Sequence, residues 1–181
     1  SGCAGARPKP SPILSLFSFL YKKENVGFTL QFDDAPSEPI EIAHRAGAPS
    51  YDADVNVNEP NISTLDSGYQ LIEVPLEAIA WGRSGDKGNK ANIGIIARHR
   101  NLLPYIWDTF SEEKIVEIFS HFLENDKVDR HYLPGISGVN YVLHDVLGGG
   151  GTTSLRNDPQ GKGYAQILLS CKISVPKNLL V

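Results

Sequence analysis

The stretch "WGRSGDKGNKANIGIIAR", residues 81–98, places a glycine-rich polar run between two apolar segments. Its second half, "ANIGIIAR" (91–98), is short, apolar and rich in isoleucine, as a buried strand is. The preceding segment, "YQLIEVPLEAIAWGRS" (69–84), is strand-like over its whole length, and Pro75 within it favours an edge position or a bulge. The stretch therefore predicts two strands joined by the polar run.

A helix follows in "SEEKIVEIFSHFLEN" (111–125). Ser111 can cap its start, and Glu112 and Glu113 lie in the first turn, where acids favour the positive end of the helix dipole. Apolar residues then recur at i, i+3, i+4 and i+7, as one helix face requires: Ile115, Ile118, Phe119 and Phe122. Just before it, "LLPYIWDTF" (102–110) predicts a short helical turn.

Three further segments complete the compact part. "KVDRHYLP" (127–134) is typical of a weak strand that stops at its proline. "SGVNYVLHDVLGGGG" (137–151) has apolar residues at helical spacing before four glycines, which predicts a second helix. "YAQILLSCKISVP" (164–176) alternates like a final strand. The predicted order is β-β-α-β-α-β, an α+β ferredoxin-like sandwich with two helices on one face of a four-stranded sheet.

The first part of the chain has a different character. Its opening "SGCAGARPKPSP" is irregular, whereas "VGFTLQFD" (26–33) and "PIEIAHRAG" (39–47) predict a hairpin. Residues 50–68 are polar and turn-rich, which indicates a linker. We therefore divide the chain into 1–68, an N-terminal extension that ends a preceding absent domain, and 69–181, the compact domain. The lack of methionine fits a fragment or processed product.

Composition narrows the class of protein. A formal net charge of -4 offers no basic field for a phosphate backbone, so we expect no nucleic-acid partner. No apolar run approaches the roughly 18–20 residues that cross a bilayer. Cys3 and Cys171 lie far apart without metal-ligand spacing, which favours reduced thiols. We expect a cytoplasmic protein, or one of the mitochondrial matrix in a eukaryote.

The polar run between the first two strands is the first candidate for chemistry. Arg83 can grip a carboxylate or phosphate with two parallel hydrogen bonds, Lys87 adds a mobile positive charge, and glycine-flanked N–H groups can form an anion-binding concavity. We interpret Asp86 as a partner that orients Arg83 or Lys87. The alternative is ordinary turn chemistry, because the same residues form hairpin loops.

The second candidate is the loop that begins "LGGGGTTSLR" and ends at Lys162. If it lies beside the first loop, the two share one anionic group, such as a substrate carboxylate or a phosphate of coenzyme A. The alternative is that four glycines merely turn the chain sharply. The candidate ligand-binding residues are Arg83, Ser84, Asp86, Lys87, Asn89, Asn92, Gly149, Gly150, Ser154, Arg156 and Lys162.

Catalytic residues are not assigned. No two histidines have metal-ligand spacing, so we expect no metal site. His144 and Asp145 are adjacent, and neighbours on a helix point about 100° apart, so they do not form a simple acid–base dyad. We expect His144 to contact a partner or solvent. Ser84 has no nucleophile-elbow context, which disfavours covalent catalysis.

The segments "GRSGDKGNKANIGIIAR" (82–98), "HYLPGISGVNYVLHDVLGGGG" (131–151) and "TSLRNDPQGKGYAQILL" (153–169) together resemble the C-terminal ferredoxin-fold domain of the acyclic terpene utilisation AtuA family. The similarity runs in order over 69–176. Gly82 stands where we expect a small alanine. The opening "SGCAGARPKPSP" resembles the end of the family's larger N-terminal domain.

The resemblance implies a role in bacterial catabolism of acyclic terpenes or branched acyl-CoA compounds, without implying the reaction. The expected partners are the absent N-terminal domain, a second copy in a homo-oligomer and a small anionic substrate, with CoA as part of the substrate and no other cofactor. On this hypothesis the domain contributes its anion site to a larger enzyme and is inactive alone. The alternative is a non-catalytic oligomerisation or docking module.

Overall fold

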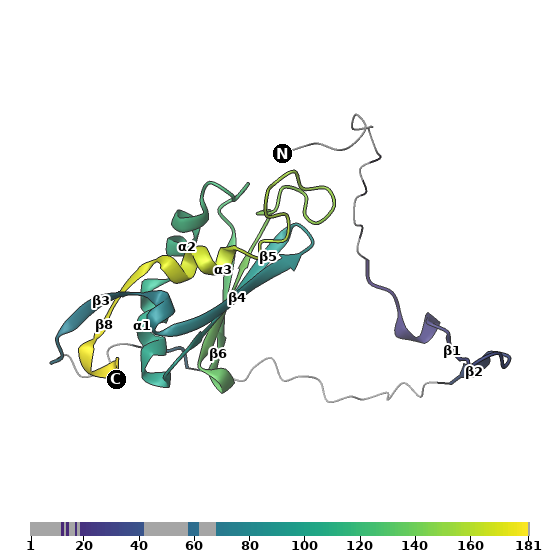
Figure 1. Cartoon of the computed structure of the whole chain (residues 1–181), viewed down its shortest axis with the longest axis horizontal. Coiled ribbons are helices and arrows are strands. Elements are labelled where there is room, and N and C mark those ends of the chain that lie inside the picture. The colour runs from purple at the N-terminus through teal and green to yellow at the C-terminus, as the bar shows by residue number, and fades with distance from the viewer. Residues whose placement is uncertain are drawn as a thin grey trace, which may run out of the picture. The chain divides into compact units, whose positions relative to one another are not determined.

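The computed structural model describes residues 12, 14, 17, 19–41, 58–61 and 68–180. Internal contacts divide the chain into residues 17–57 and a larger unit of residues 1–16 and 58–181 (Figure 1). The irregular start and most of the expected linker lie outside the described residues. We describe each unit by itself.

The smaller unit contains a short hairpin at the place where the sequence predicts one. A 3-10 turn, η1 (Lys23–Asn25), precedes β1 (Phe28–Leu30), which pairs antiparallel with β2 (Glu38–Ile40). All residues of both strands are exposed. The predicted second strand extended to residue 47, and the part beyond residue 41 lies outside the described residues.

The larger unit is built on a four-stranded antiparallel sheet of β4 (Ala80–Lys87), β5 (Lys90–Ala97), β6 (Val128–Leu133) and β7 (Gly138–Leu143), in the order β4-β5-β7-β6. β4 and β5 form a hairpin whose turn contains Gly88 at a φ of +68°, a backbone conformation that glycine adopts without strain. The two strands are neighbours, as predicted, but the polar run is not the predicted loop: its residues up to Lys87 belong to β4, and only Gly88 and Asn89 form the turn.

The helices give the sheet its ferredoxin-like connection. After a 3-10 turn, η4 (Arg100–Leu102), α1 (Leu103–Thr109) and α2 (Glu112–Phe119) link β5 to β6, and β7 then inserts between these two strands. This is a split β-α-β unit. The predicted long helix is confirmed as the shorter α2, and the Ser111 hydroxyl accepts a hydrogen bond from the Lys114 N–H at its start.

A second, two-stranded sheet pairs β3 (Leu71–Pro75) with β8 (Lys172–Pro176). The sequence predicted one strand over 69–84, but η3 (Leu76–Ala78) separates β3 from β4 directly after Pro75. The order from residue 69 is therefore β-β-β-α-α-β-β-α-β, so the predicted β-β-α-β-α-β order is wrong.

The predicted helix over 137–147 is wrong, because its main part is the strand β7. Val139, Tyr141 and Leu143 alternate along this strand, and each is fully buried. The same segment also fits helical spacing if Tyr141 is ignored. The strand fits better, since β7 lies in the middle of the sheet and pairs with β5 and β6.

The predicted strand over 164–176 is correct only in its last part. Residues Tyr164–Ser170 form α3, in which Tyr164, Ala165 and Leu168 are buried at helical spacing. Packing on β4 favours this helix, since a Cβ added at Gly82 would lie only 3.2 Å from the Leu169 side chain. Gly82 thus makes room for α3 against the sheet.

One core cluster joins the sheet to the helices. The buried side of β5 is formed by alternate residues: Ala91, Ile93, Ile95 and Ala97. Ile106 of α1, Ile115 of α2 and Leu168 of α3 belong to the same cluster. The Tyr141 hydroxyl donates to the Phe110 carbonyl at 2.8 Å inside it, and burial raises the pKa of this tyrosine. No helix in the described part of the chain could span a membrane.

The glycine-rich loop after β7 packs against the β4–β5 turn. The Val146 N–H donates to the Asn89 carbonyl at 3.0 Å, and the Gly149 N–H donates to Asn89 Oδ1 at 2.7 Å. A Cβ added at Gly150 would overlap the carbonyl group of Gly88. The two glycine-rich loops of the sequence therefore meet in space.

We predict that Gly150→Ala lowers the free energy of unfolding by more than Gly151→Ala, as measured by urea denaturation. Both glycines have positive φ, +75° and +45°, but a Cβ at residue 151 meets nothing within 4 Å. Gly151→Ala should cost about 1–2 kcal/mol of backbone strain. Gly150→Ala should add about 1–3 kcal/mol of overpacking. Equal losses for the two variants would contradict the observed packing of the loops.

Candidate functional site

The strand register builds a polar surface on the sheet face opposite the buried side of β5. We call this surface the open face. Its three central rows run across β4, β5, β7 and β6 in register. They are Trp81, Ile96, Gly138 and Leu133; Arg83, Gly94, Asn140 and His131; and Gly85, Asn92, Val142 and Asp129. The first row is mostly apolar and the second mostly polar.

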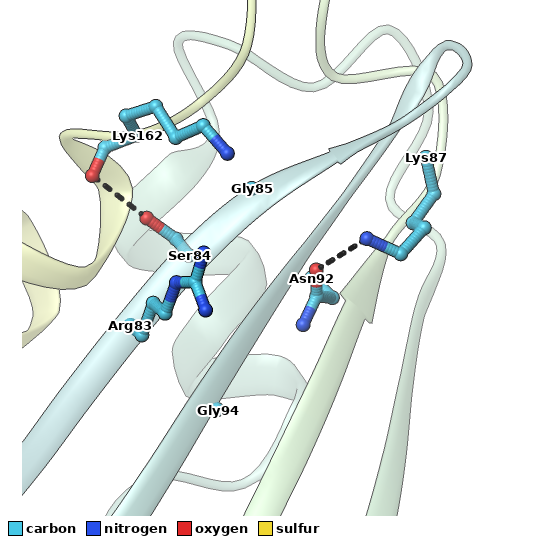
Figure 2. Close-up of a pocket in the computed structure, with 7 residues that line it drawn as sticks. All are labelled: Arg83, Ser84, Gly85, Lys87, Asn92, Gly94 and Lys162. Carbon is cyan, nitrogen blue, oxygen red and sulfur yellow. Dashed lines mark hydrogen bonds between the residues drawn. The ribbon is translucent and has the colours of Figure 1, made fainter.

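A hollow of about 260 Å³ lies over the β4 side of this face. We call it the cationic hollow, and its lining residues are Arg83, Ser84, Gly85, Lys87, Asn92, Gly94 and Lys162 (Figure 2). Three of these residues are cations and none is an acid. Neither Arg83, Lys87 nor Lys162 forms an ion pair within the described part of the chain.

Lys162 reaches the hollow from the loop that precedes α3. Its backbone is held at both ends, because its N–H donates to Asp158 Oδ1 at 3.0 Å and its carbonyl accepts from the Ser84 hydroxyl at 3.0 Å. Its side chain runs over Gly85, where an added Cβ would lie 2.9 Å from the Lys162 Nζ (Figure 2). The glycine therefore leaves the space that this amino group occupies.

Lys87 and Asn92 form the other side of the hollow. The Lys87 Nζ donates to the Asp86 carbonyl at 2.9 Å and to Asn92 Oδ1 at 3.4 Å (Figure 2). Asn92 Nδ2 in turn donates to Asn140 Oδ1 at 3.2 Å. This chain fixes the Asn92 amide. The sequence reading missed Asn140, because it took β7 for a helix; an alternating strand would have placed Asn140 on the face of Asn92.

The hollow groups three cationic side chains around one space, and its one hydroxyl is already hydrogen-bonded. Arg83 has the planar donor fork that carboxylates and phosphates prefer, and Lys162 and Lys87 add two ammonium groups. The Ser84 side chain is buried, and its oxygen donates to the Lys162 carbonyl and accepts from the Ala165 N–H at 2.9 Å. Ser84 thus ties β4 to α3.

Asp86 does not have the predicted orienting role. It is paired with the buried Ala91, so its side chain alternates to the helix-covered side, away from Arg83. No ion pair among the described residues joins the Asp86 carboxylate to Arg83 or Lys87. The hydrogen bond between Lys87 and Asp86 goes to the backbone carbonyl of Asp86.

Five candidates, Asn89, Gly149, Gly150, Ser154 and Arg156, serve the loop packing instead of lining the hollow. Asn89 binds the Gly149 N–H and donates to Asp145 at 3.0 Å, and Gly150 packs on the β4–β5 turn. Arg156 donates to the carbonyls of Phe122 and Val146. The remaining candidate, Ser154, accepts from the Arg156 N–H at 3.2 Å. Of the second glycine-rich loop, Lys162 alone among the predicted residues lines the hollow.

His144 has a partner that the sequence reading did not identify. His144 directly follows β7 and is buried, and its Nε2 lies 2.6 Å from Oδ2 of Asp129 on β6. Asp145 is instead held by Asn89 and Asn125. The expectation of a partner or solvent contact for His144 came from the wrongly predicted helix. In the described part of the chain no three His, Cys, Asp or Glu residues are grouped as metal ligands.

The split β-α-β sheet and its open face define a ferredoxin-like α+β domain. A cluster of cations lies beside its β4–β5 hairpin. The family model described as the AtuA ferredoxin-like domain matches residues 74–174, and the chain belongs to this family. The resemblance read from the sequence is thereby confirmed. Comparisons with curated proteins and with solved structures found no match.

We predict that Ser84→Ala lowers the free energy of unfolding by about 1–3 kcal/mol, because it leaves the buried N–H of Ala165 without an acceptor. Ser120→Ala is the matched control: the Ser120 hydroxyl donates to the Glu117 carbonyl on an exposed surface, so its loss should cost about 0.5 kcal/mol or less. Urea denaturation measures both. A Ser84→Ala variant as stable as the control would contradict this role.

The His144–Asp129 contact predicts a pH dependence. The hydrogen bond from His144 lowers the pKa of Asp129 below its ordinary value, against a smaller opposing effect of desolvation. The contact therefore stabilises the fold above the ordinary pKa of aspartate, and this contribution is lost as the pH falls through the lowered value. His144→Leu should raise the Asp129 pKa in a carboxyl NMR titration. If the Asp129 pKa is the same in the variant, the hydrogen bond from His144 is not what lowers it.

Proposed function

We propose that this domain binds the carboxylate or phosphate of a small substrate in the cationic hollow. It contributes this site to a larger enzyme of acyclic terpene or branched acyl-CoA catabolism, together with a neighbouring AtuA domain. The observation that carries the proposal is the grouping of Arg83, Lys87 and Lys162 around one hollow without a lining acid.

Electrostatics favour an anion at this place. The cations held around one hollow repel one another. A bound anion attracts each of them, and this attraction offsets the repulsion. Arg83 supplies direction through its donor fork, whereas Lys162 and Lys87 supply charge. Gly94 has no side chain to fill the space, so a ligand group can approach the strand backbone there.

The hollow is suited to holding a substrate in place. Its lining contains no histidine, cysteine or carboxylate, and the Ser84 hydroxyl is already bonded on both sides. A fixed anionic group orients the rest of a substrate toward reacting groups that the neighbouring domain supplies, and such orientation accounts for a large part of many rate accelerations. On this proposal the domain alone has no turnover.

A second candidate function is protein docking or oligomerisation. The observation that favours it is the exposure of large apolar side chains on the open face, with Trp81 54% and Ile136 53% exposed. Apolar surface of this kind is often covered by another protein. Docking predicts that apolar substitutions on the open face change the mass of the protein in solution.

We predict that Arg83→Gln weakens the binding of inorganic phosphate about tenfold or more, because a charge-assisted hydrogen bond is worth about 1.5–3 kcal/mol. Lys162→Gln should weaken it in the same direction. Amide chemical shifts measured during a phosphate titration at low salt report the affinity. Both residues have their charged groups at the open face, so the fold should be retained.

Lys172→Gln is the matched control, because it removes the same charge from an exposed residue of β8, in the other sheet. It should leave phosphate binding within about twofold of the original. If Arg83→Gln and Lys162→Gln bind phosphate as tightly as Lys172→Gln does, the cationic hollow is not an anion site.

A further inference from the structure

A second hollow, of about 230 Å³, adjoins the cationic hollow on the open face. Its lining is apolar apart from Arg83, and we call it the apolar hollow. Arg83 and Gly94 line both hollows. The remaining lining residues that matter here are Trp81, Ile96, Leu133 and Ile136.

The apolar hollow is held in shape by its surroundings. The Arg98 guanidinium lies 4.6 Å from the centre of the Trp81 ring and holds it by a cation–π contact. At Gly138 an added Cβ would lie 2.9 Å from the Ile95 carbonyl oxygen and 3.3 Å from the Ile136 side chain. The glycine therefore allows Ile136 to lie close to the sheet.

The register explains why the two hollows are neighbours. Trp81 and Ile96 form one cross-strand pair, and Arg83 and Gly94 form the next pair on the same face. A ligand group beside Arg83 is thus one pair away from the Trp81 ring. Because Gly94 carries no side chain, nothing on β5 separates the cations from the apolar residues at this point.

Resting on the proposed function, we infer that the ligand is a free carboxylic acid whose carboxylate lies in the cationic hollow and whose apolar body, joined directly to it, lies in the apolar hollow. A CoA thioester does not have this form. In a thioester the acyl carboxyl group carries no charge, and the long pantetheine arm separates the phosphates from the acyl chain. Neighbouring hollows require charge and apolar body to be adjacent.

A nucleotide part of CoA fits the pair of hollows less well. Its phosphate suits the cations, but its adenine then lies in the apolar hollow, where ring nitrogens and the amino group lack partners. Unpaired polar atoms that lose their water weaken binding. An alkyl or other hydrocarbon body has no such atoms, and each buried methylene adds to the affinity.

The test is a titration of the full chain with acetate, butanoate, hexanoate and octanoate. We expect the affinity to rise about twofold to fourfold for each added methylene that the apolar hollow buries. Fluorescence of the half-exposed Trp81 should change with octanoate and stay unchanged with acetate or phosphate. Octanoate should bind more tightly than octanoyl-CoA or CoA.

A double variant, Leu133→Ser with Ile136→Ser, should lose the dependence on chain length and keep its phosphate affinity. Both residues are partly exposed, at 37% and 53%, so the fold should tolerate the change. Leu155→Ser is the matched control, since Leu155 is exposed and does not line the apolar hollow. It should retain the full chain-length dependence.

The outcomes separate this inference from the proposed function. Absence of phosphate binding would overturn the anion site itself. Phosphate binding with no dependence on chain length, or tighter binding of octanoyl-CoA or CoA than of octanoate, would overturn the free-acid inference and leave the anion site. A double variant that changes mass in solution, while octanoate binds as before, would assign the apolar hollow to a second copy of the chain and also overturn it.

Discussion

The pairing of β4 with β5 is the constraint on which the rest of the structure depends. Ser84 lies opposite the buried Ile93, and Arg83 lies opposite Gly94 on the other face. Because side chains alternate along a strand, a slip of β4 by one residue would turn Arg83 toward the core and Ser84 toward solvent. Core burial and the arrangement of the cations are therefore fixed by the same register, so the hydrophobic energy of the core also holds the site in place.

Elements with local signals could be predicted from the sequence, and elements defined by distant contacts could not. The β4–β5 hairpin and α2 have glycines, a cap and clear periodicity of their own. The sequence of β7 fits both strand and helix spacing. It forms a strand because it pairs with β5 on one side and β6 on the other. α3 buries Leu168 and places Leu169 near Gly82, a contact between residues far apart in the sequence.

The candidate site shows the same division. The polar run drew attention to Arg83 and Lys87, because donors and glycines stand together there, and both residues line the cationic hollow. Arg156 has the same donor chemistry, yet its guanidinium is occupied by the carbonyls of Phe122 and Val146, which no sequence pattern indicates. Lys162 lines the hollow because its loop is fastened to Ser84 on the edge strand. Residue type therefore identified suitable cations, and the fold selected among them.

The backbone of Lys162 is held by hydrogen bonds to Asp158 and Ser84, whereas its side-chain amino group is not held by an ion pair with any described residue. When a ligand arrives, the disorder that is lost belongs to a single flexible side chain, and the loop behind it is already ordered. The entropic penalty of recruiting this lysine is thus on the order of 2 kcal/mol at most. On the proposed function, the same flexibility would let one scaffold accept anionic groups of somewhat different size.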